Sequence, residues 1–60
     1  MKRYIIRYHD GQEERERAFS SKVEAFRWFN RQCPAPSAAL VEEEPDGTRT
    51  PPKALRRKGA

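Results

Sequence analysis

The chain has 60 residues, a formal net charge of +4 and 35% hydrophobic residues, which indicates one small domain of marginal stability. It contains one cysteine and one histidine, which exclude an internal disulfide and a four-ligand zinc site. No apolar stretch reaches the ~18 residues of a membrane span, and the N-terminus lacks the apolar core of a signal peptide, so a cytoplasmic protein is expected.

The positive charge is concentrated at the C-terminus. Residues 1–52 contain nine Lys or Arg and nine Asp or Glu, so this part is neutral. The excess comes from four residues, Lys53, Arg56, Arg57 and Lys58. Pro51-Pro52 ends regular structure, and the residues after these prolines have no periodicity. We therefore expect a folded domain over residues 1–50 and a disordered basic tail over residues 51–60.

Residues 2–9 form the first predicted strand, because they have high strand propensity and their side chains alternate between two faces through "RYIIRY". One face carries Tyr4, Ile6 and Tyr8, and the other carries Arg3, Ile5 and Arg7. Asp10-Gly11 comes next, and this dipeptide is typical of a two-residue hairpin loop. With that loop, Arg7 pairs with Glu14 across the strands, and the arginines of "ERER" share the face of the tyrosines. A three-residue loop would place like charges together, so we prefer the two-residue loop.

The second predicted strand contains the charged run "EERER" at residues 13–17. Strands that are central in a sheet need apolar faces, whereas a charged strand is tolerated at an edge. Such an edge also resists pairing with other chains. We therefore expect this strand at the edge of the sheet, beside the first strand.

A helix is predicted from Lys22 to Gln32. Ser21 as N-cap and Glu24 three residues later form a capping box, and the prolines after Cys33 end the helix. An apolar stripe faces the sheet and consists of Val23, Ala25, Phe26, Phe29 and Cys33.

"SAALVEE" predicts a third strand over residues 37–43, with a turn at residues 45–47 after it. Thr48-Arg49-Thr50 is a candidate for a short fourth strand. A right-handed crossover through the helix places the third strand beside the first. The predicted fold is therefore an α+β domain with the plan β-β-α-β(-β). Its antiparallel sheet has the order 2-1-3, and one helix packs on one face.

The sequence favours binding over catalysis. His9 lies beside the hairpin turn, where a solvated histidine is expected, and Cys33 lies on the apolar stripe as a core residue. A charged surface explains the carboxylates better than acid/base catalysis does. The sequence also contains no phosphate-binding Gly-rich loop. We expect no enzyme activity, no cofactor and no metal.

Trp28 has two interpretations. Its ring extends a thin core, or it is exposed beside Arg27 and Arg31 as part of a binding surface, since Trp and Arg are enriched in binding hot spots. The acidic groups at two strands either are solvated or complement a basic groove on a partner. The predicted partner-binding residues are Trp28, Arg27, Arg31, Glu13, Glu14, Glu16, Glu42 and Glu43.

Nucleic-acid binding is the competing hypothesis. The four basic tail residues 53 and 56–58 would give weak, nonspecific and salt-sensitive contact with phosphates. Tyr4 and Tyr8 on the sheet would act as stacking platforms, although the same tyrosines are needed to cover the helix stripe. We expect a monomer or, if strand edges pair, a weak homodimer.

In its β-β-α-β layout over residues 1–50, the chain resembles small phage-encoded inhibitors, namely anti-CRISPR proteins and inhibitors of host RNA polymerase. The resemblance is one of plan and charged edges, and no motif carries over a functional residue. It implies inhibition by docking on a host protein or nucleoprotein complex, without catalysis.

Overall fold

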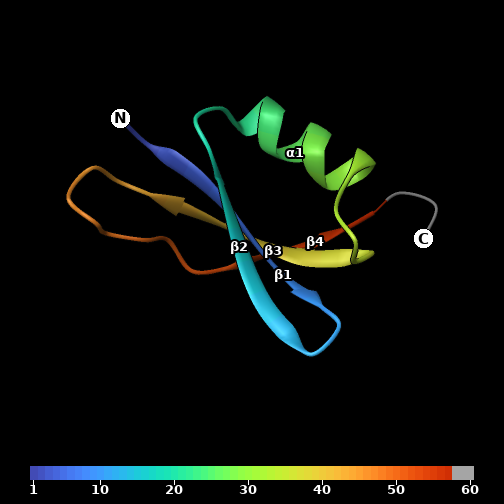
Figure 1. Ribbon diagram of the computed structural model, residues 1–60. Helices are drawn as coiled ribbons and strands as arrows, with labels where there is room; N and C mark the ends of the chain where they lie inside the picture. Colours follow the sequence, from blue (N-terminus) through green and yellow to red (C-terminus); the bar gives the residue numbers. More distant parts are fainter. Residues whose placement is uncertain (58–60) are drawn as a thin grey trace.

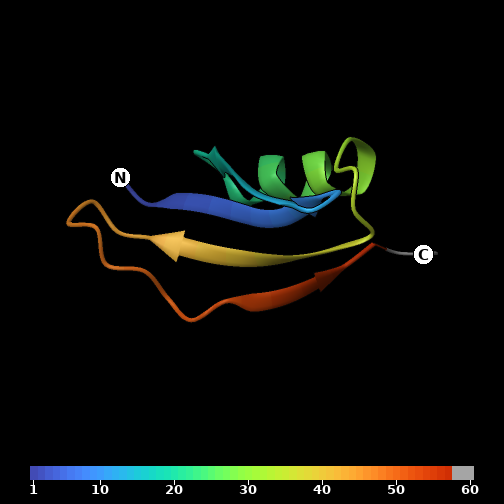
Figure 2. The same cartoon turned by 60° about the horizontal axis from the view of Figure 1, so that its bottom comes forward.

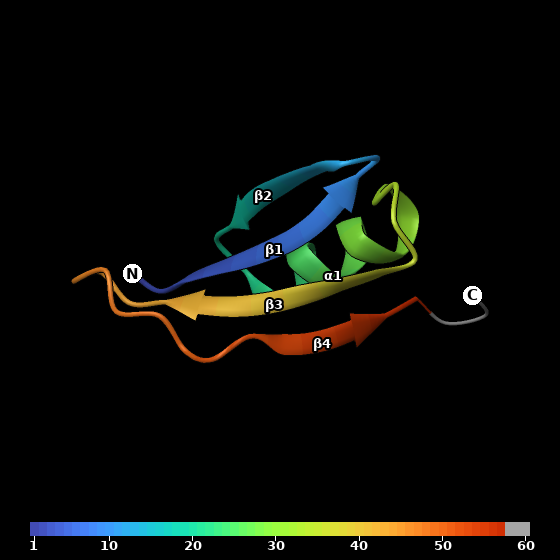
Figure 3. The ribbon, with the colours of Figure 1, turned by 90° about the horizontal axis from the view of Figure 1, so that it is seen from below.

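The computed structural model describes residues 1–57 and contains an antiparallel sheet with one helix (Figure 1). The elements are β1 (Arg3–Asp10), β2 (Glu13–Phe19), α1 (Lys22–Arg31), β3 (Ser37–Glu43) and β4 (Lys53–Arg56). Figure 3 shows the strands side by side in the order β2-β1-β3-β4. The predicted α+β plan is confirmed, with β1 between β2 and β3 and with β2 at an edge.

The hairpin loop is Gly11-Gln12, so the predicted pairing was wrong by two residues. Asp10 pairs with Glu13, and Arg7 pairs with Glu16. Gly11 has a φ of 67°, and no other residue of the hairpin has a positive φ, which is the requirement of a turn with glycine at its first central position. A shift of two residues preserves the face of every side chain. The arginines of β2 therefore lie on the tyrosine face, as expected.

Helix α1 begins as predicted and ends one residue early. The Ser21 hydroxyl accepts a hydrogen bond of 3.3 Å from the backbone N–H of Glu24, which satisfies one of the free donors of the first turn. Ala25 and Phe29 are buried in the helix, and Cys33 is buried just after it. Val23 is 64% exposed, so its assignment to the buried stripe was wrong. It lies on the opposite flank of the helix from Trp28, which packs toward β1 and β2.

The segment after Pro52 forms part of the sheet. Lys53–Arg56 pairs antiparallel with β3, with Leu55 opposite Ala38. The predicted disorder was therefore wrong for these residues, and the fourth strand predicted at residues 48–50 contributes only one bridge, from Arg49 to Glu43. Periodicity did not reveal β4 because Leu55 is its single large apolar residue. Lys58 lies outside the described residues.

Arg57 attaches the end of β4 to the loop after the helix. Its backbone N–H donates to the carbonyl of Pro36 at 2.7 Å. Its guanidinium donates to the carbonyls of Cys33 and Ala35. Both carbonyls lie in the loop after the helix, and hydrogen bonds from a charged donor to them hold this loop against the end of β4. Arg57 thus acts within the fold, in contrast to its expected place in a free tail.

The main core lies between the helix and the sheet. Figure 2 shows α1 against one face only, with the other face of the sheet free of helix. The cluster of buried side chains comprises Ile6, Ala25, Phe29, Cys33, Leu40 and Leu55. Trp28 packs against it from the side, with its ring centroid 5.2 Å from that of Tyr8 and 5.6 Å from that of Phe19. The partly buried position of Trp28 agrees with the core interpretation of this residue.

Candidate functional site

The face of the sheet opposite the helix, here called the open face, has an apolar row of its own. Ile5 and Val41 pair with each other and are each 2% exposed. Neither belongs to the core cluster beneath α1. Successive side chains of a strand point to opposite faces, so these two lie on the open face, where no helix covers them. Other side chains must therefore exclude water from them.

A chain of alternating charges crosses the open face. Arg7 on β1 contacts Glu14 at 2.5 Å and Glu16 at 3.2 Å. Arg49, from the segment between β3 and β4, contacts Glu16 at 3.4 Å and Glu43 at 2.9 Å. Arg3 also donates to Glu43, at 2.9 Å from Nε. The six side chains thus form one continuous network in which charges of opposite sign alternate.

Arg49 bridges the strands on either side of β1, above the apolar row. Its guanidinium reaches from Glu43 on β3 to Glu16 on β2, and β1 lies between these two strands. The side chain therefore crosses the sheet over Ile5 and its neighbour on β3. Long basic side chains can cover apolar surface with their stems while their charged ends remain in water. The network provides on this face the cover that α1 provides on the other.

The network lowers the pKa of Glu43 below its usual value of 4.5, first through the hydrogen bond from Arg3 and then through that from Arg49. A carboxylate whose pKa is lower in the folded state stabilises the fold above its unfolded pKa. That stabilisation is lost as the pH falls through the folded pKa. Stability should therefore decrease below pH 4.5.

We expect Arg49→Met to lower the urea midpoint at pH 7, because Glu16 and Glu43 each lose one of two arginine partners, while the substitution keeps an apolar stem. The loss should be smaller at pH 3, below the usual value of 4.5, because the stabilisation that Arg49 gives the Glu43 carboxylate is lost as the pH falls through the lowered pKa of that group. Urea titrations monitored by circular dichroism at both pH values measure this. Arg27→Met is the control, since Arg27 is exposed and has no ion pair among the described residues. Equal losses at the two pH values would contradict a role for the ion pairs.

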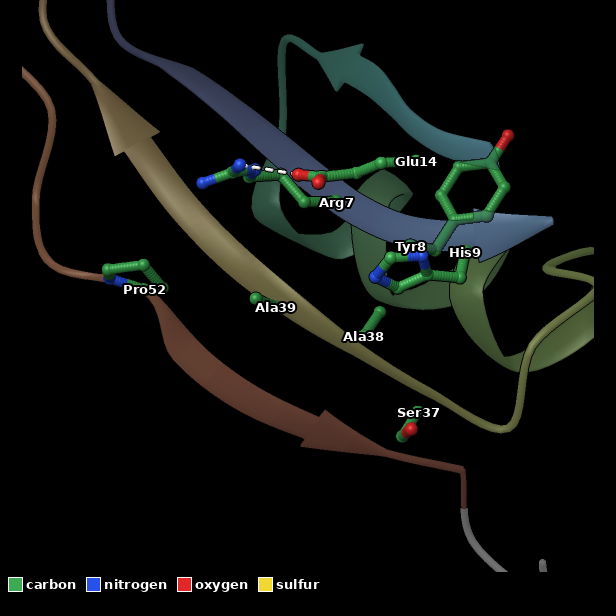
Figure 4. Close-up of a pocket in the computed structure, with 8 residues that line it drawn as sticks. All are labelled: Arg7, Tyr8, His9, Glu14, Ser37, Ala38, Ala39 and Pro52. Carbon is green, nitrogen blue, oxygen red and sulfur yellow. Dashed lines mark hydrogen bonds and ion pairs between the residues drawn. The ribbon is translucent and has the colours of Figure 1, made fainter. Parts of the chain in front are cut away.

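The other half of the open face is hollowed. A depression of about 350 Å³ lies between β1 and β4, over the N-terminal half of β3. Figure 4 shows its lining, with Arg7, Glu14 and the ring of His9 on one side and Pro52 on the other. The remaining lining residues are Tyr8, Ser37, Ala38 and Ala39.

Small side chains create the hollow. Ala39 lies between Arg7 on β1 and Ala54 on β4 in the same row of the sheet. In the next row Ser37 lies opposite Arg56. The floor is thus apolar or weakly polar, while the rim carries charge and one imidazole. Such a shape suits a side chain inserted from a partner, as in the central pockets of protein interfaces.

The structure does not unite the predicted partner-binding residues in one surface. Glu14, Glu16 and Glu43 lie on the open face, and Trp28 lies on the helix side. Arg27 and Arg31 are exposed on α1. All five predicted acidic residues are in ion pairs within the chain, including Glu13 with Arg15 at 2.6 Å and Glu42 with Lys2 at 2.8 Å.

The predicted nucleic-acid residues are also dispersed. Lys53 shares the face of Leu55 beneath the helix, and Arg56 lies on the open face. The guanidinium of Arg57 is bound to backbone carbonyls. Lys58 lies outside the described residues. The described members of the set therefore do not form a single basic patch.

Sequence reasoning missed the hollow. The available signal was the run of small residues "SAA" at the start of the third predicted strand, beside a first strand with long side chains. The hollow could be recognised only once the position of β4 was known, because Ala54 and Pro52 form the side of the hollow away from β1.

No family model, curated protein or solved structure matches this chain. Among residues 1–57, no helix is long and apolar enough to cross a membrane.

Proposed function

We propose that the protein is a non-enzymatic binding module that docks on a protein partner through the open face. The hollow over Ala39 carries this proposal, because it is a concave site on the face that α1 leaves uncovered. An apolar side chain of the partner would insert between His9 and Pro52. The ionic network beside the hollow would form part of the polar rim that surrounds such a contact.

The chemistry of the hollow supports a protein partner over a nucleic acid. Glu14 is part of its rim and Arg7 is already paired with that carboxylate, so few positive charges remain there for phosphates. A floor of alanines offers contact area without hydrogen-bonding groups for bases. The hollow also offers little aromatic surface on which bases could stack, because the tyrosines of β1 face the helix.

The resemblance in plan to phage-encoded inhibitors supports a more concrete form of the proposal. A module of this kind would inhibit a host protein or nucleoprotein complex by occupying a surface, as anti-CRISPR or host-takeover proteins do. A similar fold layout does not identify the partner. Capture from host lysate would identify it.

Filling the hollow should abolish docking. We expect Ala39→Phe to weaken capture of the partner by at least about tenfold, which corresponds to about 1.4 kcal/mol, because the new ring occupies the space that the partner needs. Tagged full-length protein is used as bait in nuclease-treated host lysate, and each captured protein is quantified by mass spectrometry. Val23→Phe is the matched control, since it adds a ring to an exposed position on the helix.

A partner that is captured equally by wild type and Ala39→Phe but lost with Val23→Phe would place docking on the helix. Capture that occurs only in a parallel lysate without nuclease treatment would support the nucleic-acid hypothesis instead. Circular dichroism of both variants establishes that each is folded.

A further inference from the structure

A second surface, on the helix side of β2, contains positive charge that no ion pair within residues 1–57 neutralises. The guanidinium of Arg17 lies 5.3 Å from the centroid of the Trp28 ring and 5.8 Å from that of Phe19. No carboxylate among the described residues forms an ion pair with it. The aromatic contacts hold the guanidinium in place, so its donors are preorganised for a ligand.

Two further arginines extend this charge over the helix. Residues three or four positions apart are neighbours on a helix surface, so Arg31 lies beside both Trp28 and Arg27. Both arginines are exposed and have no ion pair within the described part of the chain. We call Arg17, Trp28, Arg27 and Arg31 the arginine patch.

Most acids of the chain form ion pairs away from the patch. Seven acidic residues form ion pairs within the described structure, namely Asp10, Glu13, Glu14, Glu16, Glu42, Glu43 and Glu44. Glu24 lies three and four positions before Arg27 and Trp28, so it is their neighbour on the helix surface. Its carboxylate is 3.5 Å from the hydroxyl of Ser20. In residues 1–52 the charged groups that form no ion pair with a described residue are Arg17, Arg27, Arg31, Glu24 and Asp46. The three unpaired positive charges all belong to the arginine patch.

We propose that the arginine patch binds an acidic peptide segment of a partner protein. Guanidinium groups form paired hydrogen bonds with carboxylates, and the three arginines of the patch would bind several successive acidic side chains. A nucleic acid fits less well, because Arg17 already lies over the Trp28 ring and a stacked base would have to displace it. This surface is on the opposite side of the sheet from the hollow and does not depend on it.

A fluorescently labelled peptide of ten glutamates is the probe for this proposal. We expect the full-length protein to bind it with an affinity that falls as salt is raised. Arg17→Gln/Arg31→Gln should weaken binding by about tenfold or more, and Arg27→Gln/Arg31→Gln should do so without touching the aromatic contact. Lys53→Gln/Arg56→Gln removes the same charge from β4 and should leave affinity within about twofold.

Each alternative result overturns the proposal in a defined way. Equal losses in the patch and β4 variants would show attraction by net charge alone. Absence of peptide binding at low salt would exclude the site. A ten-nucleotide oligo-dT that binds more tightly than the peptide, and that is lost with the same patch variants, would assign the surface to nucleic acid. Ala39→Phe should leave peptide binding unchanged, so failure of the hollow and failure of the patch can be distinguished.

Discussion

Deletion of residues 53–60 is expected to abolish cooperative folding, although the sequence alone predicts a disordered tail here. Leu55 is 9% exposed and belongs to the core cluster. The deletion also removes β4 from the edge of β3 and the bonds from Arg57 to the loop after the helix. A domain of 60 residues has little stability in reserve. Thermal unfolding monitored by circular dichroism should show no cooperative transition.

The point variant Leu55→Ala separates the core contact from the rest of the segment. Removal of a buried leucine side chain costs about 2–5 kcal/mol, and we expect about 2–3 because Leu55 lies near the rim of the core. Arg56→Ala is the control, since Arg56 is exposed on the same strand. A truncated protein that unfolds with the wild-type midpoint would show that β4 is dispensable.

Trp28→Ala should be the second most damaging change. It removes the ring contacts with Tyr8 and Phe19 and leaves Arg17 without its aromatic support. Loss of a fully buried Trp costs about 3–5 kcal/mol, and this half-buried one should cost about 2–3. Urea titration measures the free energy of unfolding. Loss of binding in this variant would therefore reflect partial unfolding and would not identify an interface.

Trp28→Phe is the control for that variant, because it keeps an aromatic ring in the cluster and should recover most of the stability. A Trp28→Ala protein as stable as wild type would mean that the ring is an external binding group only. The arginine variants of the patch are better tests of binding, since they leave this aromatic cluster intact or change it least.

Elements with a strong local pattern were predictable from the sequence. Alternation in β1, the N-cap Ser21 and the crossover rule together determined the strand order and the side of the sheet that the helix covers. The faces of the β2 arginines were also correct, despite an error of two residues in the pairing, because an even shift preserves the face. These features depend on interactions between residues close in the chain or on general rules of topology.

The remaining features depend on contacts that a local pattern does not contain. The strand β4 is defined by Leu55 fitting into a core built from distant segments. Arg49 acquires its role by reaching Glu16, a residue 33 positions away. Some ion pairs of the acids also join distant residues, such as Arg3 with Glu43 and Lys2 with Glu42. Because all five predicted acidic residues are paired within the chain, the hollow and the arginine patch replace the predicted acidic docking edges as candidate surfaces.

The proposed docking site can be tested directly through His9, the only histidine of the chain, whose ring lines the hollow. Once the captured partner is purified, NMR spectra of the labelled protein are recorded with and without it. The His9 ring signals should shift or broaden on addition of the partner, while the methyl signals of Val23 on the helix flank stay unchanged. Unchanged His9 signals together with shifted Val23 signals would contradict docking through the open face.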